Sequence, residues 1–145
     1  MNIADYIEKV NKDIYKDSGV KNQVSDMKIN IMLFMIYGSF YNKYKKSLWK
    51  PHFEAGKYCP VEKEYNHIGW LDNAVDIEKL TKPQKKELER MVKKLLTFST
   101  HTLVDACQTM GAYKDYKKVP IDGVAVFDKA IPAKAIKECF KRIWF

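Results

Sequence analysis

Apolar residues near the start of the chain recur at the three- and four-residue spacing that is typical of an amphipathic helix. The residues that would share one apolar face are Ile3, Ile7, Val10 and Ile14. Lysines and acidic residues occupy the positions between them, so the opposite face would be polar. The pattern predicts a first helix that ends near Ser18 and Gly19, because glycine commonly follows the end of a helix.

A second helix is predicted over the strongly apolar stretch that follows, with Ser25 or Asp26 as its N-cap. Residues 27–41 are apolar nearly all round, which is typical of a helix buried on most of its sides. Residues 41–47 then become basic, and we expect this end to emerge into solvent. The stretch would form a buried central helix.

Helical periodicity disappears between residues 48 and 61, where two prolines and a glycine interrupt the chain. We interpret this part as a loop with a short extended piece around Phe53. Residues 61–68 would form a short helix, and residues 69–78 would be a connection.

Thr81 and Gln84 predict the start of another helix, since a threonine N-cap and a glutamine three residues later can form a capping box. The apolar face that follows at helical spacing consists of Leu88, Met91, Val92, Leu95 and Leu96. A further helix is predicted over residues 99–110, with Gly111 as its stop. Its inward residues would be Leu103, Ala106, Cys107 and Met110.

The last part of the chain combines a turn at residues 120–123, a β-like run at residues 124–127 and a final helix. Pro132 would open this helix, and its apolar residues are Ile136, Phe140 and Ile143. No repeat or linker divides the chain. We therefore expect a single, mainly α domain over residues 1–145: a compact helical bundle around the buried central helix, with a small extended or β element.

The chain is basic, with 26 lysines and arginines against 18 acidic residues and a net charge of +8. This charge favours acidic partners, whether nucleic acid, an anionic membrane or an acidic protein face. Only Arg90 and Arg142 are arginines, although bidentate reading of phosphates and guanine edges is chiefly an arginine task. The hydrophobic content of 46% excludes a disordered chain.

Three cysteines, Cys59, Cys107 and Cys139, lie far apart, unlike the even and dense set of a secreted disulfide framework. The first residues lack the basic and apolar regions of a signal peptide. The apolar run at residues 31–37 is far shorter than the roughly 20 residues of a membrane span. These features predict a cytoplasmic protein without a membrane partner.

Catalytic chemistry has one candidate, His101 and Asp105, which are four residues apart on a predicted helix and would share one face. They could form an oriented acid–base pair, or a structural polar pair near the helix start. No nucleophile motif accompanies them, which favours the structural interpretation. We therefore predict a protein that is not an enzyme.

Metal and nucleotide sites find no support in the spacing of the chain. The histidines and cysteines match no usual ligand pattern, and the six glycines are isolated, which excludes a phosphate-cradling loop. Cys107 and Cys139 suit buried helical positions, whereas Cys59 would be exposed in a loop. We predict no catalytic residue, no metal and no cofactor.

Two segments, residues 41–50 and 113–118, interleave lysines with aromatic residues. They could be solvated chain, a stacking surface for single-stranded nucleic acid, or a protein-binding surface with aromatic anchors. The scarcity of arginine favours a protein partner over nucleic acid. For Trp49, Phe53 and Tyr58 the core is favoured over a contact surface, because an aromatic cluster beside a buried helix normally closes the core. The candidate partner-binding residues are Lys43, Tyr44, Lys45, Lys46, Trp49, Lys50, Tyr113, Tyr116, Lys117 and Lys118.

A family resemblance rests mainly on the stretch from Ser25 to Tyr65. A capped apolar helix leads into Tyr37-Gly38-x-x-Tyr41, and then come Leu48-Trp49, Phe53-Glu54-Ala55-x-Lys57-Tyr58-x-Pro60-Val61 and Tyr65. Thr100-His101 and the closing segment Ile131 to Phe140 follow in the expected order. This succession resembles the Panacea domain, also called SocA-like.

The resemblance implies a mostly α-helical domain of bacteria, prophages and phages. It implies an antitoxin that neutralises a toxin by direct protein binding, without catalytic residues. We therefore hypothesise a protein-binding module of the antitoxin kind. The alternative is a phage-encoded inhibitor of a bacterial defence system, similar to an anti-CRISPR protein, that binds an effector protein or its guide RNA.

Overall fold

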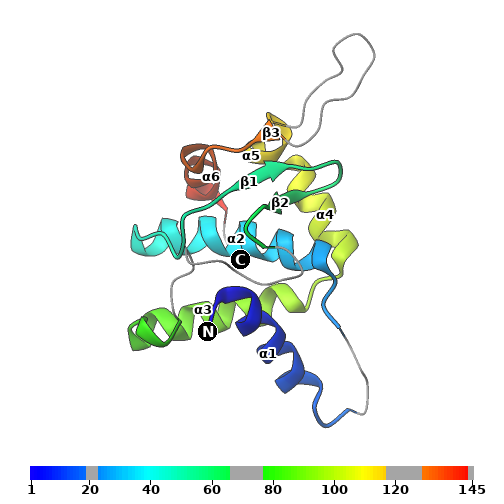
Figure 1. Ribbon diagram of the computed structural model, residues 1–145, viewed down its shortest axis with the longest axis vertical. Helices are drawn as coiled ribbons and strands as arrows, with labels where there is room; N and C mark the ends of the chain where they lie inside the picture. The colour runs from blue at the N-terminus through cyan, green and yellow to red at the C-terminus, as the bar shows by residue number, and fades with distance from the viewer. Residues whose placement is uncertain (19–22, 66–76, 117–128, 144–145) are drawn as a thin grey trace.

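The computed structural model describes residues 1–18, 23–65, 77–116 and 129–143, and these residues are mostly helical (Figure 1). The prediction of a mainly α chain with a small extended element is confirmed for this part of the sequence. None of its helices is long and apolar enough to cross a membrane. The helices are α1 (Ile3–Tyr15), α2 (Asp26–Tyr44), α3 (Lys82–Leu96), α4 (Thr100–Thr109), α5 (Gly111–Lys114) and α6 (Ala133–Cys139), with 3₁₀ turns η1 (Ile77–Lys79) and η2 (Phe140–Arg142).

Helix α2 is buried along most of its length, as its apolar sequence predicts. Ser25 caps its N-terminus, with Oγ accepting a hydrogen bond from the Lys28 N–H at 3.2 Å. In Figure 1, α1 and α3 lie on one side of α2, and the sheet, α4, α5 and α6 lie on the other. Lys45 ends the helix in the left-handed region, at φ 53°, and its N–H donates to the Tyr41 carbonyl.

The capping box of α3 is confirmed. The Gln84 N–H donates to Thr81 Oγ1 at 3.3 Å, and the Thr81 N–H donates to Gln84 Oε1 at 3.0 Å. The five apolar residues predicted for its inner face are all buried. On α1, Ile14 was predicted on the apolar face but is 47% exposed, because the last turn of α1 extends away from α3 (Figure 1).

The extended piece predicted around Phe53 is one strand of a three-stranded antiparallel sheet. Phe53 pairs with Glu62, and Ala55 pairs with Lys129. The helix predicted over residues 61–68 is wrong where the structure describes it, because β2 pairs with β1 there; residues 66–68 lie outside the described part. In the order β2-β1-β3, the strands are β1 (Phe53–Ala55), β2 (Pro60–Glu62) and β3 (Lys129–Ala130).

The helix predicted over residues 99–110 is present as α4, with Ser99 as its N-cap. The prediction that Gly111 ends this helix is wrong. Met110 leaves the helical region at ψ 130°, and Gly111 begins α5. Leu103 and Cys107 are buried, while the other two predicted inward residues are only partly buried. The predicted turn and β-like run at residues 120–127, and most of the connection at 69–78, lie outside the described residues.

The last helix begins after Pro132, as predicted, and continues as η2. The Phe140 ring is fully buried and lies 5.5 Å from the Phe34 ring in an edge-on contact. Phe140 also lies directly against Gly38, where a β-carbon would meet its ring atoms. The missing side chain of Gly38 therefore lets α6 and η2 dock closely on α2.

Candidate partner-binding surface

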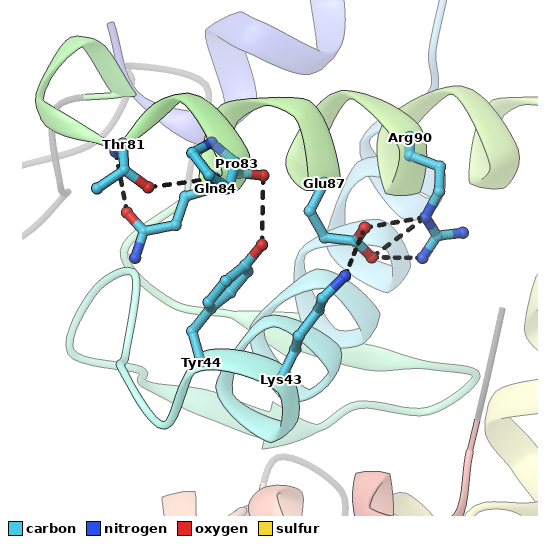
Figure 2. Close-up of polar contacts among 7 residues, drawn as sticks. All are labelled: Lys43, Tyr44, Thr81, Pro83, Gln84, Glu87 and Arg90. Carbon is cyan, nitrogen blue, oxygen red and sulfur yellow. Dashed lines mark hydrogen bonds and ion pairs between the residues drawn. The ribbon is translucent and has the colours of Figure 1, made fainter.

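The end of α2 is tied to α3 by the first two predicted partner-binding residues (Figure 2). Lys43 Nζ lies 3.1 Å from Glu87 Oε2, and the Tyr44 hydroxyl donates to the Pro83 carbonyl at 3.2 Å. Arg90 binds the same carboxylate, with Nη2 2.6 Å from Glu87 Oε1. The hydrogen bonds from Arg90 and Lys43 lower the pKa of Glu87, so this carboxylate stays ionised. Lys43 and Tyr44 thus contribute to the junction of two helices.

Trp49 and Tyr113 were predicted as partner-binding residues, but both lie in the core. Trp49 is 2% exposed, and its Nε1–H donates to Glu62 Oε2 at 2.9 Å. Tyr113 is fully buried, and its hydroxyl donates to the Gly56 carbonyl at 2.7 Å. These rings can be buried because the polar atom of each one finds a partner inside the fold. They do not form part of the surface.

Glu62 is a fully buried carboxylate that no pattern in the sequence indicates. It accepts hydrogen bonds from the Trp49 indole and from the backbone N–H groups of His52 and Glu64, the latter two at 3.1 Å. Burial raises the pKa of Glu62, and these hydrogen bonds lower it in part. The Glu62 N–H donates to Asn30 Oδ1 at 2.9 Å, which fastens β2 to α2. The network fixes the loop around Trp49, and its role is structural.

The remaining lysines of the first segment are exposed. Lys45, Lys46 and Lys50 all reach solvent, and Lys45 Nζ lies 6.0 Å from the centre of the Tyr41 ring. In the second segment, Tyr116 is half-buried with Lys129 Nζ 5.5 Å from its ring centre. Lys117 and Lys118 lie outside the described residues.

A basic hollow of about 460 Å³ lies between the end of α2 and α6, and we call it the α2–α6 hollow. Lys137 Nζ lies 4.2 Å from the centre of the Tyr41 ring. Lys141 pairs with Glu138 at 2.8 Å, and this bond lowers the pKa of Glu138. The residues that line the hollow are Tyr41, Lys45, Lys134, Lys137, Glu138 and Lys141.

Three ammonium groups in the α2–α6 hollow have no ion-pair partner in the part of the chain that the structure describes. Lys45, Lys134 and Lys137 form no side-chain hydrogen bond or ion pair with any residue that the structure describes. Among the residues that the structure describes, Glu138 is the one acid that lines the hollow; Lys141 binds it directly, and Lys134 acts on it only through its charge, without a hydrogen bond or ion pair. The hollow therefore carries a local excess of positive charge that an acidic partner could neutralise.

Sequence reasoning missed the part of the hollow that α6 contributes. It identified the last helix by its apolar residues and did not consider the lysines between them. Lys134, Lys137 and Lys141 follow an i, i+3, i+7 spacing, which places side chains on one face of a helix. This spacing indicates a basic face on the last helical segment, and Lys45 at the end of α2 extends that basic surface.

The partly buried tyrosine rings near these lysines form cation–π contacts with their ammonium groups. Besides Tyr41 and Tyr116, the Tyr44 ring has Lys43 Nζ 5.7 Å from its centre and the Phe40 ring 4.8 Å away. Tyr58 was predicted to suit the core but is 52% exposed in the turn between β1 and β2, with Lys57 Nζ 5.3 Å from its ring centre.

The candidate acid–base pair and Cys59 do not form an enclosed reactive site. His101 Nε2 is 3.3 Å from Asp105 Oδ2, and the two side chains are 86% and 64% exposed, so this pair is a surface contact. Cys59 was expected to be exposed but is buried, and burial raises its pKa to about 11. No group of three or more potential ligands among the described residues could hold a metal ion.

Comparison with known proteins adds no identification. No protein-family model, curated protein or solved structure matches the chain. The resemblance to the Panacea domain therefore stays a prediction from the sequence.

Proposed function

We propose that this chain is a non-enzymatic module that binds an acidic partner protein in a stoichiometric complex and thereby neutralises it. The observation that carries the proposal is the α2–α6 hollow, with three ammonium groups that lack a fixed counter-charge among the described residues. A partner that presents carboxylates would remove this charge excess and would be steered to the surface over a distance. The antitoxin-like role implied by the resemblance is one form of this activity.

A protein partner is preferred to nucleic acid because of how the aromatic rings are used. Binding of single-stranded nucleic acid relies on ring faces on which bases can stack. The rings of Tyr41, Tyr44 and Tyr116 each have a lysine ammonium at 4.2 to 5.7 Å from the ring centre. Two further aromatic residues of the predicted segments, Trp49 and Tyr113, are buried and offer no ring face to a base. These tyrosine rings therefore hold lysine ammonium groups in place and leave little free ring face on which a base could stack.

A binding role is also supported by the exposed position of the candidate acid–base pair. General acid–base catalysis needs a positioned group within reach of a bound substrate. His101 and Asp105 lie on the open surface of α4, and neither lines the α2–α6 hollow.

The test is affinity capture from cells that carry the gene, with nuclease added before capture. We expect one acidic protein to be retained in a fixed molar ratio that size-exclusion chromatography with light scattering confirms. Dissociation of the complex at moderate salt concentration would be consistent with attraction between exposed charges. The identity of the retained protein then separates a toxin from a defence effector. Retention of nucleic acid alone, in samples without nuclease, would contradict the proposal.

A further inference from the structure

The lysine side chains of the α2–α6 hollow extend from backbone that packing against the core holds in place. Phe140 docks against Gly38 and fixes the end of α6 to α2, so the backbone positions of the lysines are set by the core. The Tyr41 ring, on the last turns of α2, then holds the Lys137 ammonium at 4.2 Å. Contact with an aromatic face limits the freedom of a lysine side chain and leaves its outward N–H groups available. When a ligand binds there, the lysine side chain loses less conformational entropy than an isolated surface lysine would lose.

We propose that the α2–α6 hollow is the docking site for a carboxylate-rich segment of the partner protein. This inference rests on the proposed function and adds to it the location of the contact and the chemistry of the partner. The carboxylates would bind the free ammonium groups of Lys45, Lys134 and Lys137, while Glu138, held ionised by Lys141, would repel acids at one border.

The dimensions of the hollow suit more than one carboxylate. The hollow extends from Lys134 on α6 to Lys141 on η2, which is paired with Glu138; seven residues separate the two lysines and correspond to roughly 10 Å along a helix axis. Alternate side chains of an extended segment are about 7 Å apart, so two acidic residues of such a segment fit within this length. Lys45 faces the row from the neighbouring helix end and can close around the segment from its other side.

Carboxylates suit these groups better than a nucleic acid backbone. No arginine lines the hollow, so it lacks the planar fork that binds phosphate oxygens in pairs. Its aromatic ring lies beneath the Lys137 ammonium, which limits the stacking of a base on that face. Both features point to simple charge pairing with an acidic protein segment.

The experiment measures binding of a fluorescein-labelled Glu-Gly repeat peptide by fluorescence anisotropy at low salt. The test variant is Lys134→Gln with Lys137→Gln. The matched control is Lys12→Gln with Lys16→Gln, which removes the same charge from exposed positions on α1, across α2 from α6 (Figure 1). We expect the test variant to bind about three- to ten-fold more weakly than wild type, as the loss of two exposed charge pairs implies, and the control to stay within two-fold.

A second measurement uses the unmodified protein and does not depend on the folding of a variant. In an NMR titration with the unlabelled peptide, the Tyr41 ring protons should shift, because a carboxylate that binds the Lys137 ammonium comes close to the ring beneath it. Shifts confined to α1 or α3 would overturn the inference.

Three further outcomes would also overturn it. Equal weakening in the test and control variants would mean that only net charge matters. Tighter binding of labelled oligothymidylate than of the peptide, lost in the same test variant, would assign the hollow to nucleic acid. If the captured partner protein binds the test variant as tightly as wild type, the docking site is wrong while the proposed function stands.

Discussion

The close contact between Gly38 and Phe140 gives a sharp prediction, because it fixes the element that carries the lysines. We expect Gly38→Ala to destabilise the protein. An ideal β-carbon at Gly38 would lie 2.6 Å from Phe140 Cε2 and closer still to two other ring atoms. The ring is fully buried, so it cannot swing into solvent to make room.

The size of the effect follows from two opposing contributions. Alanine stabilises a helix interior by about 1 kcal/mol relative to glycine. Overpacking a closed core destabilises by roughly 1–3 kcal/mol, and a ring trapped on all sides belongs at the upper end of that range. We therefore expect a net loss of about 1–2 kcal/mol in the free energy of unfolding, measured by urea titration followed by circular dichroism.

Gly111→Ala is the matched control. A β-carbon there would lie 3.5 Å from Asp115 Oδ2, an ordinary contact, so this variant should be neutral or slightly more stable. In a Phe140→Leu background, the smaller side chain should reduce the loss caused by Gly38→Ala by about 1 kcal/mol, a coupling of the size that contacting residues show. A stabilised Gly38→Ala variant, or additive effects of the two changes, would refute the reasoning.

The remaining predictions concern the buried carboxylate and the thiols. Glu62→Ala should lower the free energy of unfolding by roughly 3 kcal/mol, because one buried and two partly buried donors lose their acceptor. Glu54→Ala, which removes a surface pair with Lys63, should cost less than about 1 kcal/mol in the same urea titrations. Burial raises the pKa of Glu62, so the folded protein binds this proton more tightly than the unfolded chain. Its contribution to stability is therefore largest below the unfolded value of about 4.3 and falls as pH rises through the folded value. The stability of wild type relative to Glu62→Gln should fall over that window, and a rising difference would contradict the assignment. Native iodoacetamide labelling followed by mass spectrometry should modify the half-buried Cys139 well before the buried Cys59, whose pKa is raised to about 11, and faster labelling of Cys59 would show that its loop opens.

The sequence was sufficient for features that depend on local periodicity. The caps at Ser25 and Thr81 and the buried face of α3 follow from residues a few positions apart, and the structure contains them. The nearly uniform apolar character of α2 likewise predicts its burial without any knowledge of its neighbours.

Features that depend on distant partners could not be predicted in this way. Tyr113 looks like a surface anchor in a lysine-rich segment, and only the Gly56 carbonyl, far away along the chain, makes its burial favourable. The core position favoured for Trp49 is confirmed, but its hydrogen bond to Glu62 could not be predicted. The same limit applies to β2, whose residues pair with a strand that local propensity does not reveal. Of the predicted partner-binding residues, Lys45 lines the α2–α6 hollow, whereas most of the lysines of this hollow come from the last helical segment, which reaches α2 only through tertiary packing.

The most direct test of the account is lysine footprinting of the chain in complex with its natural partner. Acetylation of exposed lysines would be quantified by mass spectrometry for the free protein and for the complex. The account predicts protection of Lys45, Lys134 and Lys137 in the complex, with Lys12 and Lys16 modified equally in both states. Unchanged modification of the three hollow lysines, with protection elsewhere, would contradict it.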